Sequence, residues 1–138
     1  MNKLRAAVIG VGYLGRFHAQ KYAALEGVEL VGVADADPAR AAAVAAEVNA
    51  PAVTDYRALL GQADLVSVVV PTERHYEVVR ECLESGAHVL VEKPITQTVA
   101  EAEALIALAK SRNRLLQVGH LERFNPAWLA LRPRIQTP

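Results

Sequence analysis

Residues 4–35 read LRAAVIGVGYLGRFHAQKYAALEGVELVGVAD, and this stretch decides the fold. It begins with the mostly apolar run Leu4–Ile9, which predicts a strand buried on both faces. A glycine-rich turn then leads into a predicted helix, Tyr13–Glu26, which we expect Gly27 to end. Val28–Ala34 is a second apolar run. The order of strand, glycine turn, helix and strand predicts a unit of two parallel strands joined by a helix.

The same alternation continues to about residue 119. Further strands are predicted at Ala52–Val53, Asp64–Val70, Ala87–Val91 and Leu115–Val118, and further helices at Pro38–Val48, Asp55–Leu60, Glu73–Ser85 and Thr98–Arg112. We expect Asp37 to cap the helix that starts at Pro38, and Thr98 and Glu101 have the spacing of a capping box. This pattern predicts an α/β fold of the Rossmann type, a doubly wound parallel sheet of six strands in the order 3-2-1-4-5-6.

The composition bounds the class of protein. The 138 residues suit one domain, and 52% hydrophobic with 22% charged residues exclude a disordered chain. Lysine plus arginine and aspartate plus glutamate both number 15, so nothing points to nucleic acid or to an anionic membrane. Cys82 is the single cysteine, and the histidines lack metal-ligand spacing, so we expect no disulfide and no metal. Without a membrane-length apolar run or a signal-peptide pattern, we expect a cytoplasmic protein.

The glycine turn has the spacing of a dinucleotide-binding site. Gly10 permits the tight turn, Gly12 lets the backbone approach a pyrophosphate, and Gly15 lets the helix pack closely on the strand. At the start of the helix, Tyr13 and Leu14 contribute free backbone N–H groups, which together with the helix dipole favour an anion. The alternative interpretation is that these are ordinary turn glycines.

An acidic residue follows at the end of the second strand. Asp35 is placed to accept hydrogen bonds from the ribose hydroxyls of the cofactor, and its charge would repel a 2′-phosphate, so we expect NAD rather than NADP. Asp35 also suits a turn or a helix cap, but Asp37 is the better cap candidate, which leaves Asp35 free. Arg40 lies further along the helix, so we expect no arginine arranged for a phosphate.

Two more clusters follow the fourth and fifth strands. Pro71 and Thr72 are expected to border the cofactor, with His75 in the first turn of the next helix. Glu92 and Lys93 follow the fifth strand, where Lys93 would face the nicotinamide, donate a hydrogen bond to a substrate oxygen and favour an alkoxide-like state. Taken alone, Lys93 suits a solvated loop lysine held by Glu92 at least as well. We expect His18 and His88 to be packing or helix-capping residues.

The last part of the chain follows the sixth strand. Residues 119–126, GHLERFNP, offer polar groups at the same edge of the sheet, but they also suit a surface linker with Phe124 packed on the domain. Asn125 and Pro126 are expected to start a helix that runs to about Leu131 and that Pro133 stops. We divide the chain into a Rossmann dinucleotide-binding domain at 1–120 and, at 121–138, the start of a linker or helix that leads toward a carboxyl-terminal domain absent from this sequence, in which Arg132–Pro138 is expected to be linker.

Taken together, GVGYLG, Asp35, the PTxxH turn, VEKP and GHLERFNP resemble the glucose–fructose oxidoreductase/inositol dehydrogenase/MocA-like family. The resemblance covers residues 4–126 and implies a sugar or cyclitol dehydrogenase that uses NAD or NADP. It implies a cofactor contact at His75 and a catalytic role for Lys93. The stretch HLERFNPA looks most like members that act on nucleotide-linked amino sugars, such as UDP-N-acetylglucosamine 3-dehydrogenase.

The family pattern implies further contacts and a second domain. We expect Arg123 near the nicotinamide, and His120, Arg123 and Asn125 near the substrate; Glu73 replaces the family's usual asparagine. Family members continue with a domain that supplies the acid–base pair and the oligomer interface, so we expect the parent protein to be a homo-oligomer and this chain to bind cofactor with little turnover. Two alternatives are a non-enzymatic NAD-binding sensor or scaffold and a biliverdin-reductase-like oxidoreductase.

Overall fold

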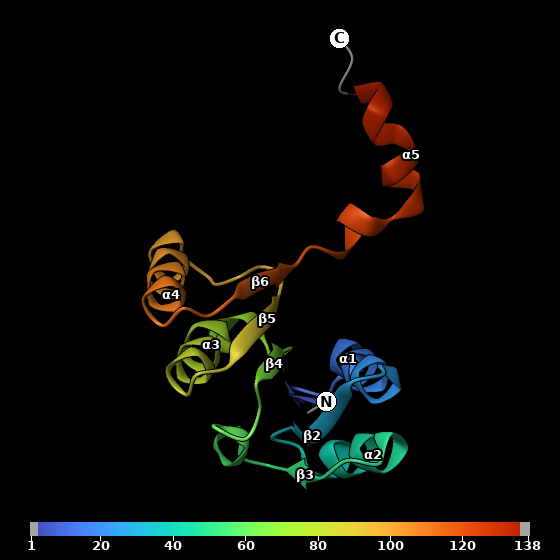
Figure 1. Cartoon of the computed structure of the whole chain (residues 1–138), viewed down its shortest axis with the longest axis vertical. Coiled ribbons are helices and arrows are strands. Elements are labelled where there is room, and N and C mark those ends of the chain that lie inside the picture. Colours follow the sequence, from blue (N-terminus) through green and yellow to red (C-terminus); the bar gives the residue numbers. More distant parts are fainter. Residues whose placement is uncertain (1–2, 136–138) are drawn as a thin grey trace.

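The computed structural model describes residues 3–135, and six parallel strands form its single sheet (Figure 1). The strands are β1 (Leu4–Ile9), β2 (Val28–Ala34), β3 (Ala52–Val53), β4 (Leu65–Val68), β5 (His88–Glu92) and β6 (Leu116–Gly119). They lie in the order β3-β2-β1-β4-β5-β6, which confirms the predicted order. The order reverses between β1 and β4, where doubly wound sheets bind ligands.

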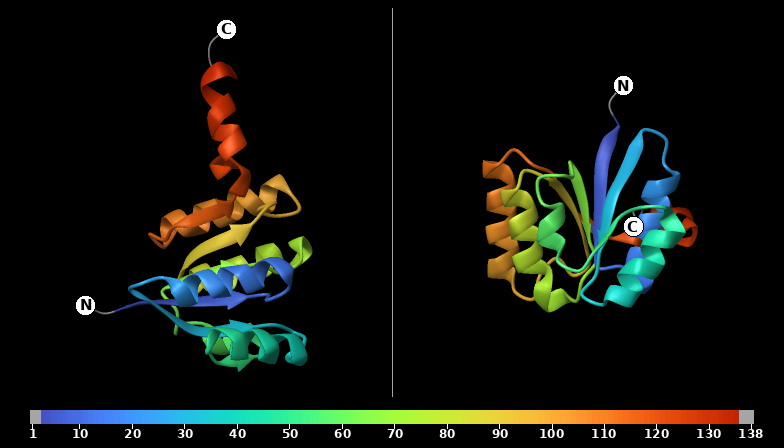
Figure 2. Two further views of the ribbon diagram at one scale, coloured as in Figure 1. Left: turned by 90° about the vertical axis from the view of Figure 1, so that its right-hand side faces the viewer. Right: turned by 90° about the horizontal axis from the view of Figure 1, so that it is seen from below.

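Helices cover both faces of the sheet. The α-helices are α1 (Tyr13–Ala24), α2 (Pro38–Val48), α3 (His75–Glu84), α4 (Val99–Ser111) and α5 (Pro126–Ile135), with 3₁₀ turns η1 (Tyr56–Leu59), η2 (Thr72–Arg74) and η3 (Leu121–Phe124). Figure 2 shows α1 and α2 on one side of the sheet and α3 and α4 on the other. The capping predictions are confirmed, because Asp37 accepts hydrogen bonds at the start of α2 and Thr98 forms a complete capping box with Glu101.

Strand β1 divides the core into two layers. Ala6 and Val8 pack with the residues under α1 and α2, whereas Ala7 and Ile9 pack with those under α3 and α4. All four side chains are at most 3% exposed. Alternate residues of a strand point to opposite faces, so a short run of apolar residues serves both layers.

Two sequence predictions about local structure are wrong. The helix expected at Glu73–Ser85 begins with η2, and only His75–Glu84 is α-helical. Pro133 does not stop the last helix, because α5 continues to Ile135. Proline has a helical φ and removes only its own N–H donor, so the two residues that follow Pro133 remain helical. Residues 132–135 are therefore helix rather than linker, and 136–138 lie outside the described residues.

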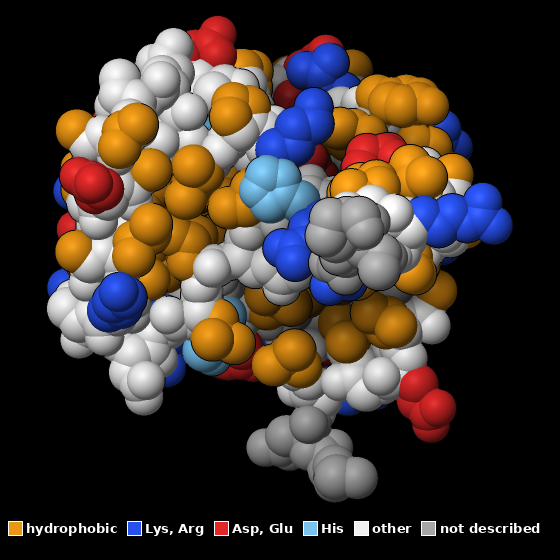
Figure 3. Space-filling view, turned by 90° about the horizontal axis from the view of Figure 1, so that it is seen from above, with side chains coloured by type: hydrophobic (Ala, Val, Ile, Leu, Met, Phe, Trp, Pro, Cys, Tyr) orange, Lys and Arg blue, Asp and Glu red, His pale blue; other side chains and the backbone are white. Residues whose placement is uncertain are grey.

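Helix α5 extends away from the sheet (Figures 1 and 2). None of its residues is buried, and Trp128, Leu129, Leu131 and Ile135 are each at least 43% exposed. Figure 3 looks down on this end of the molecule and shows apolar side chains separated by lysine and arginine side chains. Among residues 3–135, no helix has both the length and the apolar character needed to span a membrane.

The start of α1 lies unusually close to the end of β1. A Cβ atom on Gly15 would stand 1.8 Å from the carbonyl oxygen of Gly10, and Gly10 itself has a φ of +85°. By contrast, within residues 3–135 no heavy atom outside the local backbone lies within 4 Å of a Cβ built on Gly12. Gly15 is therefore required by packing and Gly12 is not.

This contrast predicts the effects of two alanine substitutions on stability. Gly15→Ala should lower the free energy of unfolding by about 1–3 kcal/mol or more, because backbone would have to move away from the new methyl group. Gly12→Ala should change it by no more than about 0.5 kcal/mol. Urea denaturation followed by circular dichroism measures both. Equal losses for the two variants would contradict the packing argument.

The ion pair between Arg5 and Asp64 predicts a pH dependence. Hydrogen bonds from the Arg5 side chain, and then from its backbone N–H, lower the pKa of Asp64 to about 2. The unfolded chain binds this proton at about pH 4, so the stabilisation is complete above that pH and is lost as the pH falls toward 2. Asp64→Asn should flatten the acid limb of the stability profile. Glu103→Gln, on the exposed side of α4, should leave that limb unchanged.

Candidate functional site

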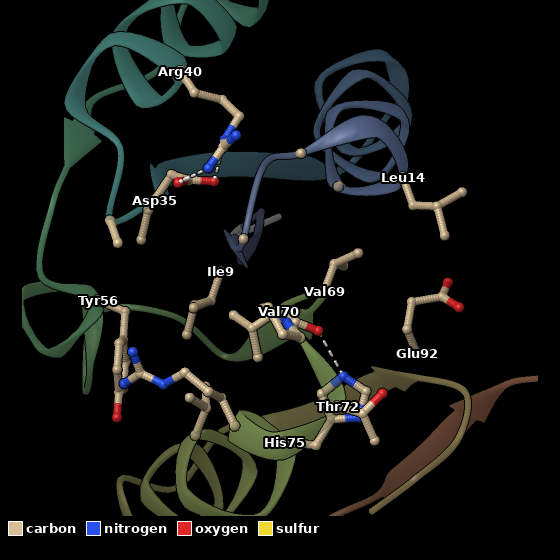
Figure 4. Close-up of a pocket in the computed structure, with 18 of the residues that line it drawn as sticks. Ile9, Leu14, Asp35, Arg40, Tyr56, Val69, Val70, Thr72, His75 and Glu92 are labelled. Carbon is tan, nitrogen blue, oxygen red and sulfur yellow. Dashed lines mark hydrogen bonds and ion pairs between the residues drawn. The ribbon is translucent and has the colours of Figure 1, made fainter.

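A cleft of about 760 Å³ lies at the carboxyl ends of β1, β2, β4 and β5 (Figure 4). It brings together most of the predicted cofactor residues: Gly10, Gly12, Tyr13, Leu14, Gly15, Asp35, Pro71, Thr72, His75, Glu92 and Lys93. These residues come from four separate turns. The parallel arrangement of the strands places all four turns at one edge of the sheet.

The floor of the cleft is the turn between β1 and α1. Gly12 is the first residue before α1, and no side chain of the described residues caps the helix there. The first N–H groups of a helix have no partner within the helix, and the helix dipole makes that end electropositive. Because the space beside Gly12 is open, an anionic group can approach these N–H groups closely.

Asp35 stands at the β2 end of the cleft and is fully engaged in hydrogen bonds. Its Oδ2 accepts from the N–H of Val11 at 3.0 Å, and its Oδ1 accepts from the N–H of Asp37 at 2.9 Å. Arg40 adds two bonds, from Nε to Oδ2 at 3.0 Å and from Nη2 to Oδ1 at 2.9 Å. The expectation that Asp35 is left free is therefore wrong.

The hydrogen bonds also set the charge of Asp35. Burial by itself would raise the pKa of this carboxyl, but the bonds from Arg40, Asp37 and Val11 outweigh it and lower the pKa. Asp35 is therefore an anion at neutral pH. The side chain is 8% exposed, so this is a buried charge held by four donors.

Arg40 is a site residue that the sequence analysis placed incorrectly. It was expected further along the helix, but it lies in the first turn of α2 and reaches back to Asp35 (Figure 4). The signal was available, because Asp37 caps this helix and fixes Arg40 within one turn of Asp35. Other lining residues without a sequence motif include Tyr56, Arg57 and Arg74.

His75 joins two of the turns that border the cleft. Its Nδ1 lies 2.8 Å from the carbonyl oxygen of Pro94, and its Nε2 lies 2.9 Å from that of Val70. The ring is 1% exposed. Both partners are acceptors, so the ring donates to both only when both nitrogens carry hydrogen. His75 therefore ties the turn after β4 to the turn after β5.

Glu92 and Lys93 behave differently from each other. The Glu92 carboxylate is buried and contacts His18 at 3.1 Å and the backbone N–H of Lys93 at 3.3 Å. The Lys93 side chain is exposed on the cleft and forms no ion pair with any residue in 3–135. Glu92 thus holds the backbone of Lys93, and the ammonium group is left available.

The three residues expected near the substrate are not among those that line this cleft. His120 and Arg123 are exposed around η3, and Asn125 uses its side-chain oxygen to accept the N–H of Ala127 at the start of α5. Their predicted contacts with nicotinamide or substrate remain predictions. Within the described residues, no group of acidic, histidine or cysteine side chains is arranged to hold a metal ion.

This sequence matches a family of NAD-binding oxidoreductases. The profile described as "Oxidoreductase family, NAD-binding Rossmann fold" matches residues 4–120. UDP-N-acetylglucosamine 3-dehydrogenase of Acidithiobacillus ferrooxidans is 48% identical over 96% of this chain and 42% of its own length. Inositol 2-dehydrogenase 1 of Saccharopolyspora erythraea is 36% identical over 94% of this chain and 40% of its own length.

Solved structures agree with the sequence matches. The A. ferrooxidans enzyme superposes with a TM-score of 0.89 at 47% identity, over 97% of this chain and 44% of its own. GenD2 from gentamicin A biosynthesis, solved with NAD, superposes with a TM-score of 0.94 at 27% identity, over 99% of this chain and 40% of its own. The chain thus spans about two fifths of the length of these relatives. It belongs to the glucose–fructose oxidoreductase/inositol dehydrogenase/MocA oxidoreductase family, as a NAD-binding Rossmann domain.

Proposed function

We propose that the cleft binds NAD(H) in preference to NADP(H), and that the whole protein is a dehydrogenase of a ring alcohol on a nucleotide-linked amino sugar. One observation carries the proposal: a single cleft joins the open glycine turn, a buried anionic aspartate and an unpaired lysine. The 48% identity to UDP-N-acetylglucosamine 3-dehydrogenase supports the substrate class.

The residues of the cleft fit the parts of a dinucleotide. The free space at Gly12 and the uncapped N–H groups of α1 suit the pyrophosphate, because a side chain at position 12 would fill that space. Asp35 is an acceptor for the ribose hydroxyls of the adenosine half, and its charge disfavours a 2′-phosphate. Lys93 follows β5 and lines the same cleft, on the other side of the β1–β4 reversal from Asp35.

Arg40 must change partners when a ribose binds. Each carboxylate oxygen has two lone pairs, and the four N–H donors already occupy those of Asp35. The two backbone donors belong to fixed turns, whereas Arg40 is an exposed, flexible side chain. The ribose hydroxyls therefore replace Arg40, and the released guanidinium lies beside the 2′ position.

In the reaction, the bound cofactor supplies or takes up the hydride. Lys93 donates a hydrogen bond to the reacting oxygen of the substrate, and its positive charge stabilises the alkoxide-like oxygen that forms as the hydroxyl gives its proton to a base in the rest of the whole protein. Loss of hydride from the carbinol carbon then leaves a ketone. Glu92 fixes the Lys93 backbone, while α1 and Asp35 hold the other end of the cofactor.

The cofactor assignment is tested by titrating this chain with NADH and NADPH and following nicotinamide fluorescence. The wild type should bind NADH more tightly than NADPH. Asp35→Ala should weaken NADH binding roughly 10- to 100-fold, because hydrogen bonds to a charged acceptor are lost, and should abolish the preference. Gly12→Ala should weaken both cofactors without unfolding the chain. Failure of the folded wild type to bind either cofactor would refute the proposal.

The release of Arg40 from Asp35 predicts how NADPH binds to two variants. In the Asp35→Ala background, Arg40 is free to pair with the 2′-phosphate, so NADPH binding should be retained or improved. Asp35→Ala combined with Arg40→Ala should then lose NADPH binding roughly tenfold relative to Asp35→Ala alone. Identical NADPH affinities in the single and double variants would show that Arg40 does not reach the phosphate.

For Lys93, the readout is turnover by the whole protein with UDP-N-acetylglucosamine and NAD. Lys93→Met should lower kcat about 10²- to 10³-fold, as expected for loss of one donor to a developing oxyanion. The dissociation constant for NADH should change less than about threefold. Lys110→Met, on α4, provides the matched control and should leave both quantities unchanged. A normal kcat for Lys93→Met would exclude this role.

A further inference from the structure

Three buried side chains and the partly buried His18 form a continuous hydrogen-bonded chain that ends at the cleft. The hydroxyl of Tyr22 lies 2.7 Å from Oγ of Ser67, which lies 3.1 Å from Nδ1 of His18. Nε2 of His18 lies 3.1 Å from Oε1 of Glu92. Ser67, Glu92 and Tyr22 are 0%, 5% and 9% exposed, so the chain runs through the protein interior from α1 to the end of β5.

The order of donors in this chain follows from its acidic end. An ionised Glu92 only accepts, so Nε2 of His18 carries the hydrogen. With a neutral ring, Nδ1 accepts from the Ser67 hydroxyl, and Ser67 accepts from Tyr22. Every polar atom is then satisfied. A doubly protonated ring would donate to Ser67 through Nδ1, and one of the two hydroxyl hydrogens, that of Ser67 or that of Tyr22, would then have no acceptor within this chain of residues.

The tyrosine at the other end agrees with this order. Burial raises the pKa of Tyr22, and the hydrogen bond with Ser67 only partly offsets it, so the hydroxyl keeps its proton at neutral pH. The chain therefore starts with a fixed donor and ends with a fixed acceptor. A neutral His18 with hydrogen on Nε2 is the one ring form that matches both ends.

Glu92 connects this chain to the cleft. Oε1 accepts from His18, while Oε2 accepts the backbone N–H of Lys93 at 3.3 Å. On the side of β6, a Cβ atom on Gly119 would lie 3.0 Å from Oε1, so Gly119 leaves just enough room for the carboxylate. Across the described residues, neither a lysine nor an arginine pairs with Glu92. His18 is its side-chain partner, and Figure 4 shows Glu92 beside Leu14 at the wall of the cleft.

We propose that His18 is a positioning residue for the nicotinamide end of the site: through Glu92 it fixes the turn that carries Lys93. The proposal rests on the proposed function, because it assumes that the cleft binds NAD(H). Burial of a carboxylate is costly unless donors satisfy it, so loss of the His18 donor would let Glu92 turn toward water and release the Lys93 backbone. The adenosine end, held by Asp35, does not depend on this chain.

The test compares NADH with ADP-ribose, which lacks the nicotinamide, by calorimetric titration of this chain. Glutamine carries an amide N–H near the position of Nε2 of histidine, and asparagine carries its amide near Nδ1. His18→Gln therefore keeps the donor to Glu92, and His18→Asn keeps only the contact with Ser67. His18→Asn should weaken NADH binding roughly three- to tenfold more than it weakens ADP-ribose binding. His18→Gln should keep the wild-type ratio of the two dissociation constants.

Two controls separate positioning from general loss of structure. His88 is a partly buried histidine whose Nδ1 accepts the N–H of Leu115, away from the cleft, so His88→Asn should not change the ratio. Asp35→Ala should weaken the binding of NADH and of ADP-ribose by similar factors, so the ratio of their dissociation constants should stay near that of the wild type. A merely structural role for His18 would affect NADH and ADP-ribose equally, or would affect the glutamine and asparagine variants equally.

A spectroscopic measurement covers the case in which His18→Asn does not fold. Long-range ¹H–¹⁵N correlation of the wild-type imidazole at neutral pH should show a neutral ring with hydrogen on Nε2. A doubly protonated ring, or hydrogen on Nδ1, overturns the inference. An unchanged NADH to ADP-ribose ratio in folded His18→Asn also overturns it and leaves the proposed function intact. Failure of the wild type to bind either ligand refutes the proposed function, and the inference with it.

Discussion

The site depends on the close contact between the start of α1 and the end of β1. Because position 15 has no Cβ, the helix approaches the Gly10 carbonyl more closely than any other residue would allow. This approach brings the uncapped end of α1 to the edge of the sheet. It also places the N–H of Val11 against Asp35 on the next strand. One steric requirement therefore fixes both the anion-binding end of the cleft and the orientation of its aspartate.

The sheet was predictable from sequence because most strand residues are apolar and the turns are marked by glycine, proline or capping residues. The cleft followed from the rule that parallel strands end at one edge. Arg40 was missed although the start of α2 was predicted correctly, because its role depends on a side chain that folds back to Asp35, and periodicity does not show that contact. Pro133 was misinterpreted for a different reason: a stop was predicted from local preference, but proline has a helical φ and removes only its own N–H donor, so the residues after it stay helical.

Asp35 shows why a motif does not describe the state of its residues. The motif identifies a carboxylate at the end of β2, and the structure shows that this carboxylate is paired with Arg40 and accepts hydrogen bonds at both oxygens. A buried anion without donors would be costly, so a partner at this position is expected on physical grounds. Arg40 is half exposed and therefore screened by water, which makes it an exchangeable partner where the backbone donors are not.

Two histidines connect the cleft to the interior by different means. His75 lies within hydrogen-bond distance of the carbonyls of two turns, whereas His18 links a carboxylate to a hydroxyl. Neither contact is visible in a sequence, because the partners are backbone atoms or residues far away along the chain. Both histidines act on the turn from Glu92 to Pro94, one from each side of the sheet. The side chain of an exposed lysine is flexible by itself. Because the turn that carries Lys93 is held at two points, the position from which its side chain enters the cleft is fixed.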